Sequence, residues 1–171
     1  ATEEFKVYSK QVIANCQTVA KALVKAGYVL VTGGTDNHLL LWNLKPTGIT
    51  GSKAERIFEA VCISCNKNTV QGDKSALSPG GVRLGTGALT TRGMKEEHME
   101  IVADFLDRAV KLGIEIQEGG AKTLKEFTDA VYASPKVAAL KAEVEAFASK
   151  FPMPSFDVSK LKYKDGLPAH S

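Results

Sequence analysis

The chain has 171 residues, of which 44% are apolar, a length and composition that suit one globular domain with a real core. Its formal net charge of +3 is too small to predict a nucleic-acid-binding surface. No apolar run approaches the roughly 20 residues that a membrane-spanning helix needs. We therefore expect a protein that binds neither nucleic acid nor a membrane.

The three cysteines are Cys16, Cys62 and Cys65, a number too small and odd for a disulfide framework. They favour a reducing compartment and a protein that is not secreted. Cys62 and Cys65 have CxxC spacing, but neither a second ligand pair nor a thioredoxin-like strand accompanies them. The favoured interpretation is two small core thiols on one face of an apolar helix, with a redox or zinc site as the alternative.

The first part of the chain predicts a helix followed by a hairpin. Apolar residues recur at spacings of three or four over residues 2–27. Residues 29–32 and 39–44 are β-prone, and the short polar link between them predicts an antiparallel pair. The second run is apolar on both faces apart from Asn43, so we expect it to be buried on both sides.

Polar residues punctuate this region. Asp36, Asn37 and His38 are typical of a turn. Ser52 and Glu55 have the spacing of a capping box and predict a helix that runs to about residue 64.

The stretch 66–93 is rich in glycine and poor in periodic apolar residues. A loop of this length in a compact domain is usually functional or disordered. Within it, Val82, Arg83 and Leu84 predict a short strand. The planar guanidinium of Arg83 suits a carboxylate bound by two parallel hydrogen bonds. The alternative is an arginine on the open face of a sheet, bound to water or to an acid.

Other polar residues of this stretch have two interpretations each. Asn66 and Asn68 can cap the preceding helix, or an amide there can recognise a planar heterocycle. Lys74 and Ser75 are loop residues of the same kind. His38, His98 and His170 lie in unrelated settings, and we expect no metal site.

The last part of the chain is mostly helical. The pattern predicts a helix over residues 95–112 and a short edge strand at Ile114 and Ile116. A second capping box, Thr123 to Glu126, opens a helix to about residue 133. A final helix begins at Pro135, runs to about residue 151 and is followed by an extended tail. The fold class is therefore α+β, a small and mostly antiparallel sheet covered by amphipathic helices.

Two motifs resemble one family closely. The runs VTGGTDNHLLL and NKNTVQGDKSALSPGGVRLGTGALTTRG, with the closing AFASKFPMP, are similar to the C-terminal region of serine hydroxymethyltransferase (glycine hydroxymethyltransferase), eukaryotic type. The resemblance implies the C-terminal domain of a fold type I enzyme that uses pyridoxal 5'-phosphate. Such enzymes interconvert serine and glycine with tetrahydrofolate as the one-carbon carrier. The resemblance also implies a homodimer or homotetramer in the mitochondrial matrix or the cytosol.

The resemblance assigns roles to individual residues. Arg83, in the VRLGT motif, would bind the substrate carboxylate and so decide which bond at the substrate Cα is broken. The implied folate contacts are Asn68, Ser75, Ala76 and Leu77. Arg92 and Thr86 would support the region of Arg83.

The chain also departs from the family pattern. Gln71 and Gly87 stand where the family usually has proline, which loosens the loop. The lysine motif that binds the cofactor covalently, the glycine-rich phosphate cup and the aspartate that pairs with the pyridine nitrogen have no counterpart here. We therefore expect residues 1–151 to be the small domain of such an enzyme, inactive without the large domain, and 152–171 to be a tail. The alternative is a standalone, non-catalytic α+β binding module.

Overall fold

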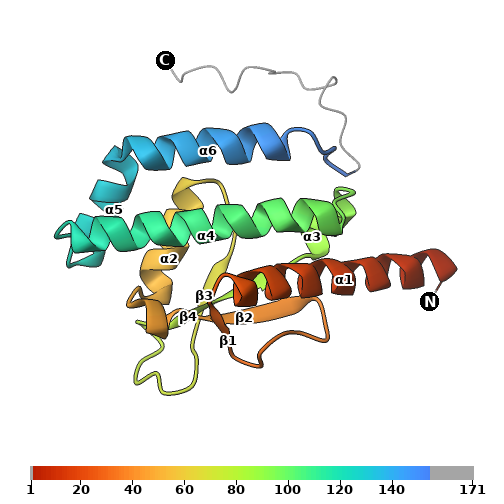
Figure 1. Cartoon of the computed structure of the whole chain (residues 1–171), viewed down its shortest axis with the longest axis horizontal. Helices are drawn as coiled ribbons and strands as arrows, with labels where there is room; N and C mark the ends of the chain where they lie inside the picture. The colour runs from red at the N-terminus through yellow and green to blue at the C-terminus, as the bar shows by residue number, and fades with distance from the viewer. Residues whose placement is uncertain (1, 155–171) are drawn as a thin grey trace, which may run out of the picture.

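A computed structural model describes residues 2–154, which form one antiparallel sheet and a set of helices packed on it (Figure 1). The α+β fold class predicted from the sequence is confirmed. The elements in chain order are α1 (Glu3–Lys25), β1 (Val29–Leu30), β2 (Leu39–Asn43), η1 (Lys45–Thr47), α2 (Gly51–Ala60), β3 (Asn66–Asn68), β4 (Gly81–Gly85), α3 (Gly87–Thr91), α4 (Glu96–Glu118), α5 (Leu124–Ala133) and α6 (Pro135–Ala148).

The sheet has the strand order β1-β2-β4-β3 with every pair antiparallel. Residues opposite one another in such pairs share a face. Trp42 and Val82 are paired and point into the core, where both are fully buried. Leu41 and Arg83 are paired on the other face, which the helices leave open. The prediction that residues 39–44 are buried on both sides is wrong, because β2 alternates between buried and half-buried positions.

The core lies between the sheet and the helices α1, α2 and α4. Trp42 is its largest buried side chain, with Tyr28 edge-on at a ring-centroid distance of 4.6 Å and Phe58 at 6.2 Å. Burying a side chain of this size stabilises the fold by roughly 1.5–3 kcal/mol.

A second helical layer, α5 and α6, covers the side of α4 away from the sheet (Figure 1). Phe147 of α6 packs edge-on against Phe105 of α4 at 5.6 Å. At the rim, Arg108 donates hydrogen bonds of 2.7 and 2.6 Å to the two carboxylate oxygens of Glu143. The helices on this side are therefore joined by both apolar packing and a bidentate ion pair.

The start of α2 differs from the prediction. The hydroxyl of Thr50, not that of Ser52, caps the helix by accepting a hydrogen bond from the Lys53 amide. Ser52 lies in the first turn and is buried. The backbone amide of Gly51 donates to Pro79 O at 2.8 Å, so a contact distant in the sequence fixes where the helix begins.

The end of α2 also corrects the prediction for the cysteines. The helix stops at Ala60, and Cys62 has a left-handed φ of 62° in the following turn. Its thiol is exposed and donates to Glu145 Oε1 of α6. Cys65 is half-buried and packs against the core cluster. The two residues therefore do not share a helix face, and only Cys65 contacts the core.

The expected edge strand at Ile114 and Ile116 is wrong, because α4 continues to Glu118. Gly113, which follows the predicted end of this helix at residue 112, lies inside α4. A Cβ atom at Gly113 would lie 2.8 Å from Ile49 Cδ1, so the glycine permits close packing of α4 on the core. The capping box of Thr123 and Glu126 and the start of α6 at Pro135 are confirmed.

Among residues 2–154, no helix has both the length and the apolar character that crossing a bilayer requires. The predicted tail falls mostly on residues 155–171, which lie outside the described residues.

Candidate functional site

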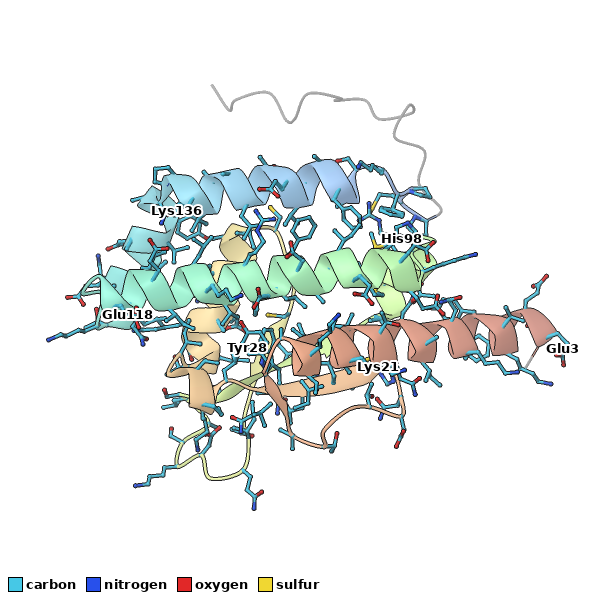
Figure 2. The ribbon with its side chains drawn as sticks, viewed as in Figure 1. Glu3, Lys21, Tyr28, His98, Glu118 and Lys136 are labelled. Carbon is cyan, nitrogen blue, oxygen red and sulfur yellow. The ribbon has the colours of Figure 1, made fainter. Side chains whose placement is uncertain are left out.

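A groove of about 970 Å³ lies between the C-terminal half of α1, the connection from β1 to β2, and the open face of the sheet. Three cations line it: Lys21 and Lys25 from α1, and Arg83 from β4. Asp36 supplies a carboxylate and Asn68 a carboxamide. Figure 2 labels Lys21 on its helix beside this groove. The groove thus carries a surplus of positive charge, which favours an anionic ligand.

Arg83 occupies the middle of β4, opposite Leu41 of β2 and Asn66 of β3. Strand neighbours on both sides hold its backbone, while its side chain is exposed on the open face. No hydrogen bond or ion pair from its guanidinium to another part of residues 2–154 is found in the structure. Its donors are therefore not committed to an acidic side chain of the described chain.

Asn68 is the last residue of β3 and pairs with Gly81 of β4. The expectation that Asn66 and Asn68 cap the preceding helix is wrong, because both residues are in the edge strand of the sheet. The Asn68 side chain is half-buried and donates one hydrogen bond of 2.9 Å to Thr69 O. Asn68 and Arg83 line the same groove.

Asp73 closes the base of the loop between β3 and β4, a role that the sequence analysis missed. One carboxylate oxygen accepts hydrogen bonds from the amides of Val70 (2.8 Å) and Gly80 (2.7 Å). The other oxygen lies 3.3 Å from Lys45 Nζ. These hydrogen bonds, the one from Gly80 above all, hold the pKa of Asp73 below its usual value. Asp is common in turns, but no local pattern in the sequence indicates that this one accepts from the amides of Val70 and Gly80.

The tip of the same loop lies away from the groove. The Ser75 hydroxyl accepts a hydrogen bond from the Leu77 amide at 3.1 Å, and the Leu77 residue is 88% exposed. Ser75, Ala76 and Leu77 are all exposed, and none of them lines the groove. The structure thus brings together Arg83 and Asn68 but does not bring these three residues to them.

Thr86, at the end of β4, is 4% exposed, and its hydroxyl donates to Val12 O of α1 at 2.8 Å. This bond ties the end of the Arg83 strand to α1.

Arg92 does not support the Arg83 region in the way expected. Its guanidinium donates to three backbone carbonyls at the end of α6, those of Ala148 (2.6 Å), Phe151 (2.9 Å) and Pro152 (3.3 Å). Helix C-termini leave carbonyls without partners, and a cation there satisfies them. Arg92 therefore fastens α6 to the segment after β4.

The chemistry available at the groove is ion pairing and hydrogen bonding. Cys65 lies outside the groove; burial and the nearby Glu55 carboxylate raise its pKa to about 12, so this thiol stays protonated and is a poor nucleophile. Among residues 2–154 no cluster of three His, Cys, Asp or Glu side chains is arranged to hold a metal ion. The groove offers guanidinium, ammonium and carboxamide groups for ion pairing and hydrogen bonding.

The family model described as serine hydroxymethyltransferase matches residues 1–106 of the chain. Serine hydroxymethyltransferase 4 of Arabidopsis thaliana is 47% identical over 164 residues, covering 96% of this chain and 35% of that protein. The cytosolic serine hydroxymethyltransferase of Oryctolagus cuniculus is 50% identical over 159 residues, covering 90% of this chain and 33% of that protein. A serine hydroxymethyltransferase of Bombyx mori is 48% identical over 160 residues, covering 91% and 34%. The chain spans about a third of the length of these curated relatives.

Proposed function

Because the chain belongs to the serine hydroxymethyltransferase family, we propose that it forms the substrate-orienting part of an enzyme that interconverts serine and glycine with tetrahydrofolate. In this enzyme Arg83 binds the carboxylate of the amino acid and Asn68 contacts the folate. The loop residues Ser75, Ala76 and Leu77 complete the folate site when the rest of the enzyme is present.

The observation that carries the proposal is the position of Arg83. Its guanidinium lines the groove together with Asn68, and the structure gives it no acidic partner among residues 2–154. A charged, bidentate hydrogen bond to a carboxylate fixes both the position and the rotation of the amino acid. Orienting the reacting molecule in this way lowers the entropic part of the barrier.

Pyridoxal 5'-phosphate, the cofactor of this family, does not fit the described residues by themselves. Lys53 is a buried lysine, but its ammonium donates to Gln117 Oε1 at 2.8 Å and Ala121 O at 3.1 Å and does not line the groove. The groove lysines, Lys21 and Lys25, are exposed on a helix. We therefore assign the cofactor to the other two thirds of the proposed enzyme and no cofactor step to this chain.

The proposed enzyme is a homodimer or homotetramer in the cytosol or the mitochondrial matrix. A cytosolic enzyme of Oryctolagus cuniculus is among the relatives, which supports the first compartment.

The test joins this chain in frame to the N-terminal two thirds of the Oryctolagus cuniculus relative and measures serine-dependent formation of methylenetetrahydrofolate. Arg83→Lys keeps the charge but loses the bidentate geometry, and we expect kcat/KM for serine to fall about a hundredfold. Asn68→Ala should raise KM for tetrahydrofolate and leave KM for serine unchanged. The matched control is Arg56→Lys, at a half-buried arginine of α2 that pairs with Glu59 away from the groove.

Two outcomes would contradict the proposal. One is an Arg83→Lys variant with the same kcat/KM for serine as the Arg56→Lys control. The other is serine cleavage by the purified 171-residue chain alone, because the described residues offer no group that holds the cofactor.

A further inference from the structure

Asn15 is a fully buried polar residue on the apolar side of α1, at 0% exposure. We propose that it is a positioning residue for Arg83, an inference that rests on the proposed function of Arg83 as the carboxylate ligand. Burying a carboxamide is unfavourable unless its hydrogen-bonding groups are satisfied. The contacts of Asn15 therefore indicate why a polar residue stands here.

Every group of the Asn15 carboxamide is engaged. Its Nδ2 donates to Thr90 Oγ1 at 2.8 Å and to Met94 O at 2.9 Å. Its Oδ1 accepts a hydrogen bond of 3.0 Å from Gln11 Nε2. Thr90 lies in α3 and Met94 follows it, so Asn15 holds both the helix after β4 and the turn behind that helix.

The hydrogen bonds continue from Thr90 back to α1. The Thr90 hydroxyl donates to Thr86 O at 2.8 Å, and the Thr86 hydroxyl donates to Val12 O of α1 at 2.8 Å. Hydrogen bonds thus link Asn15, Thr90, Thr86 and Val12 in series, and the α1 backbone between Val12 and Asn15 closes the circuit, which we call the α1–β4 ring. Thr86 is the residue that follows β4 directly, so the ring fixes the end of the Arg83 strand against α1.

The α1–β4 ring restricts the position and register of β4 relative to α1. Apolar side chains would fill the same space at similar stability, but they would tolerate small shifts of the strand. A ring of directed hydrogen bonds accepts one register, and a slip of one residue would turn Arg83 from the groove face to the core face. Because α1 also supplies Lys21 and Lys25 to the groove, the same ring fixes the distance between these lysines and Arg83.

The first arm of the test uses hydrogen–deuterium exchange on the 171-residue chain. Asn15→Leu keeps the branched shape and the number of side-chain heavy atoms and removes every hydrogen bond of the carboxamide. Thr90→Val is a milder isosteric change that opens the ring, and Thr90→Ser keeps the hydroxyl. The control is Tyr28→Phe, which removes a hydrogen bond of 2.8 Å to Asp107 elsewhere in the fold.

We expect the amides of residues 83–94 to exchange about tenfold faster in Asn15→Leu and Thr90→Val, and at the wild-type rate in Thr90→Ser and Tyr28→Phe. If Asn15→Leu does not fold, the comparison of Thr90→Val with Thr90→Ser decides. Unchanged exchange in that segment, or an equal increase in Tyr28→Phe, would overturn the inference.

The second arm measures serine kinetics in the fused enzyme described above. Thr90→Val should raise KM for serine about tenfold with kcat changed less, while Thr90→Ser and Tyr28→Phe should leave KM unchanged. In combination with Arg83→Lys, the effect of Thr90→Val should largely disappear, because both changes remove the same interaction. Additive effects would show a general structural role and overturn the inference.

The two proposals can fail separately. If Arg83→Lys alone leaves KM for serine unchanged, the proposed function of Arg83 fails. The exchange arm then still decides whether the α1–β4 ring holds the end of β4.

Discussion

The open face of the sheet and the α4–α6 side of the molecule differ in how far their charged side chains are paired and their apolar side chains are buried. On the α4–α6 side, Arg108 is bound by Glu143 and Lys136 lies beside Glu115. At the groove over the open face, the structure gives Arg83 of β4 and Lys21 of α1 no ion pair within residues 2–154. A long cationic side chain loses conformational entropy when it is fixed, and on the helical side the carboxylates offset this loss.

The apolar residues follow the same division. Leu140 of α6 is 1% exposed, whereas Leu41, opposite Arg83 on the open face, is only half-buried. On the helical side, charged and apolar groups are therefore paired or buried, whereas Arg83 and Leu41 of the open face are left exposed or half-buried within the described residues. Substitutions on the two sides should separate stability from binding.

The largest difference is expected for a matched pair of leucines. Leu140→Ala removes buried methyl groups and leaves a cavity, so it should lower the free energy of unfolding by about 2–5 kcal/mol. Leu41→Ala on the half-buried face should cost about half of this or less. Urea unfolding followed by circular dichroism measures both. Equal losses would mean that the open face contributes as much to the core as the helical side does.

The next effect compares two arginines of the same segment. Arg92→Ala removes three hydrogen bonds to the carbonyls at the end of α6 and should cost about 1–3 kcal/mol of unfolding free energy. Arg83→Ala should change it by less than about 0.5 kcal/mol, because its guanidinium has no such partners in the described chain. The same urea measurement gives both values. A large loss of stability in Arg83→Ala would contradict its assignment as a residue reserved for binding.

The sequence predicted the elements whose signal is local. Neighbouring residues alone predict the periodicity of α1, the capping box of α5 and the start of α6 at a proline. The structure confirms all three. The Val-Arg-Leu strand was also visible, because β-prone residues lie between glycines.

The elements that were missed depend on distant partners. β3 is three residues long and exists because it pairs with β4, so no periodicity could reveal it. Thr50 and Ser52 are both good caps, and the contact of Gly51 with Pro79 O selects Thr50. In the sequence Asn15 looks like any polar residue on a helix, because its partners Thr90 and Met94 are far away in the chain.

The candidate site shows the same limit. The bonds that Arg83 can form follow from its residue type, and a family motif marked Asn68 as a second candidate site residue. That the two line one groove is known only from the structure. Two contacts could not be predicted from the sequence: the ion pair of Asp73 with Lys45, and the hydrogen bonds of Arg92 at the end of α6. Each joins segments that are distant in the chain and share no sequence pattern.

The smallest expected effect concerns pH and the helical side. The hydrogen bonds from Arg108 lower the pKa of Glu143 below its ordinary value of about 4.3. A carboxyl group with a lower pKa in the folded state stabilises the fold above its unfolded pKa, and this contribution is lost as pH falls through the folded value. Unfolding midpoints of wild type and Glu143→Gln should therefore differ at pH 7 and converge towards pH 3.

The control for this last measurement is Glu118→Gln, an exposed residue at the end of α4 whose side chain extends from the helix (Figure 2). Its unfolding midpoint at pH 7 should equal that of wild type. Asp104 also faces Arg108, at 3.5 Å, and keeps the guanidinium partly paired in Glu143→Gln, which makes the effect small. If the Glu143→Gln difference persists unchanged at pH 3, Glu143 contributes by packing rather than by charge. The ion pair would then no longer distinguish the helical side from the open face.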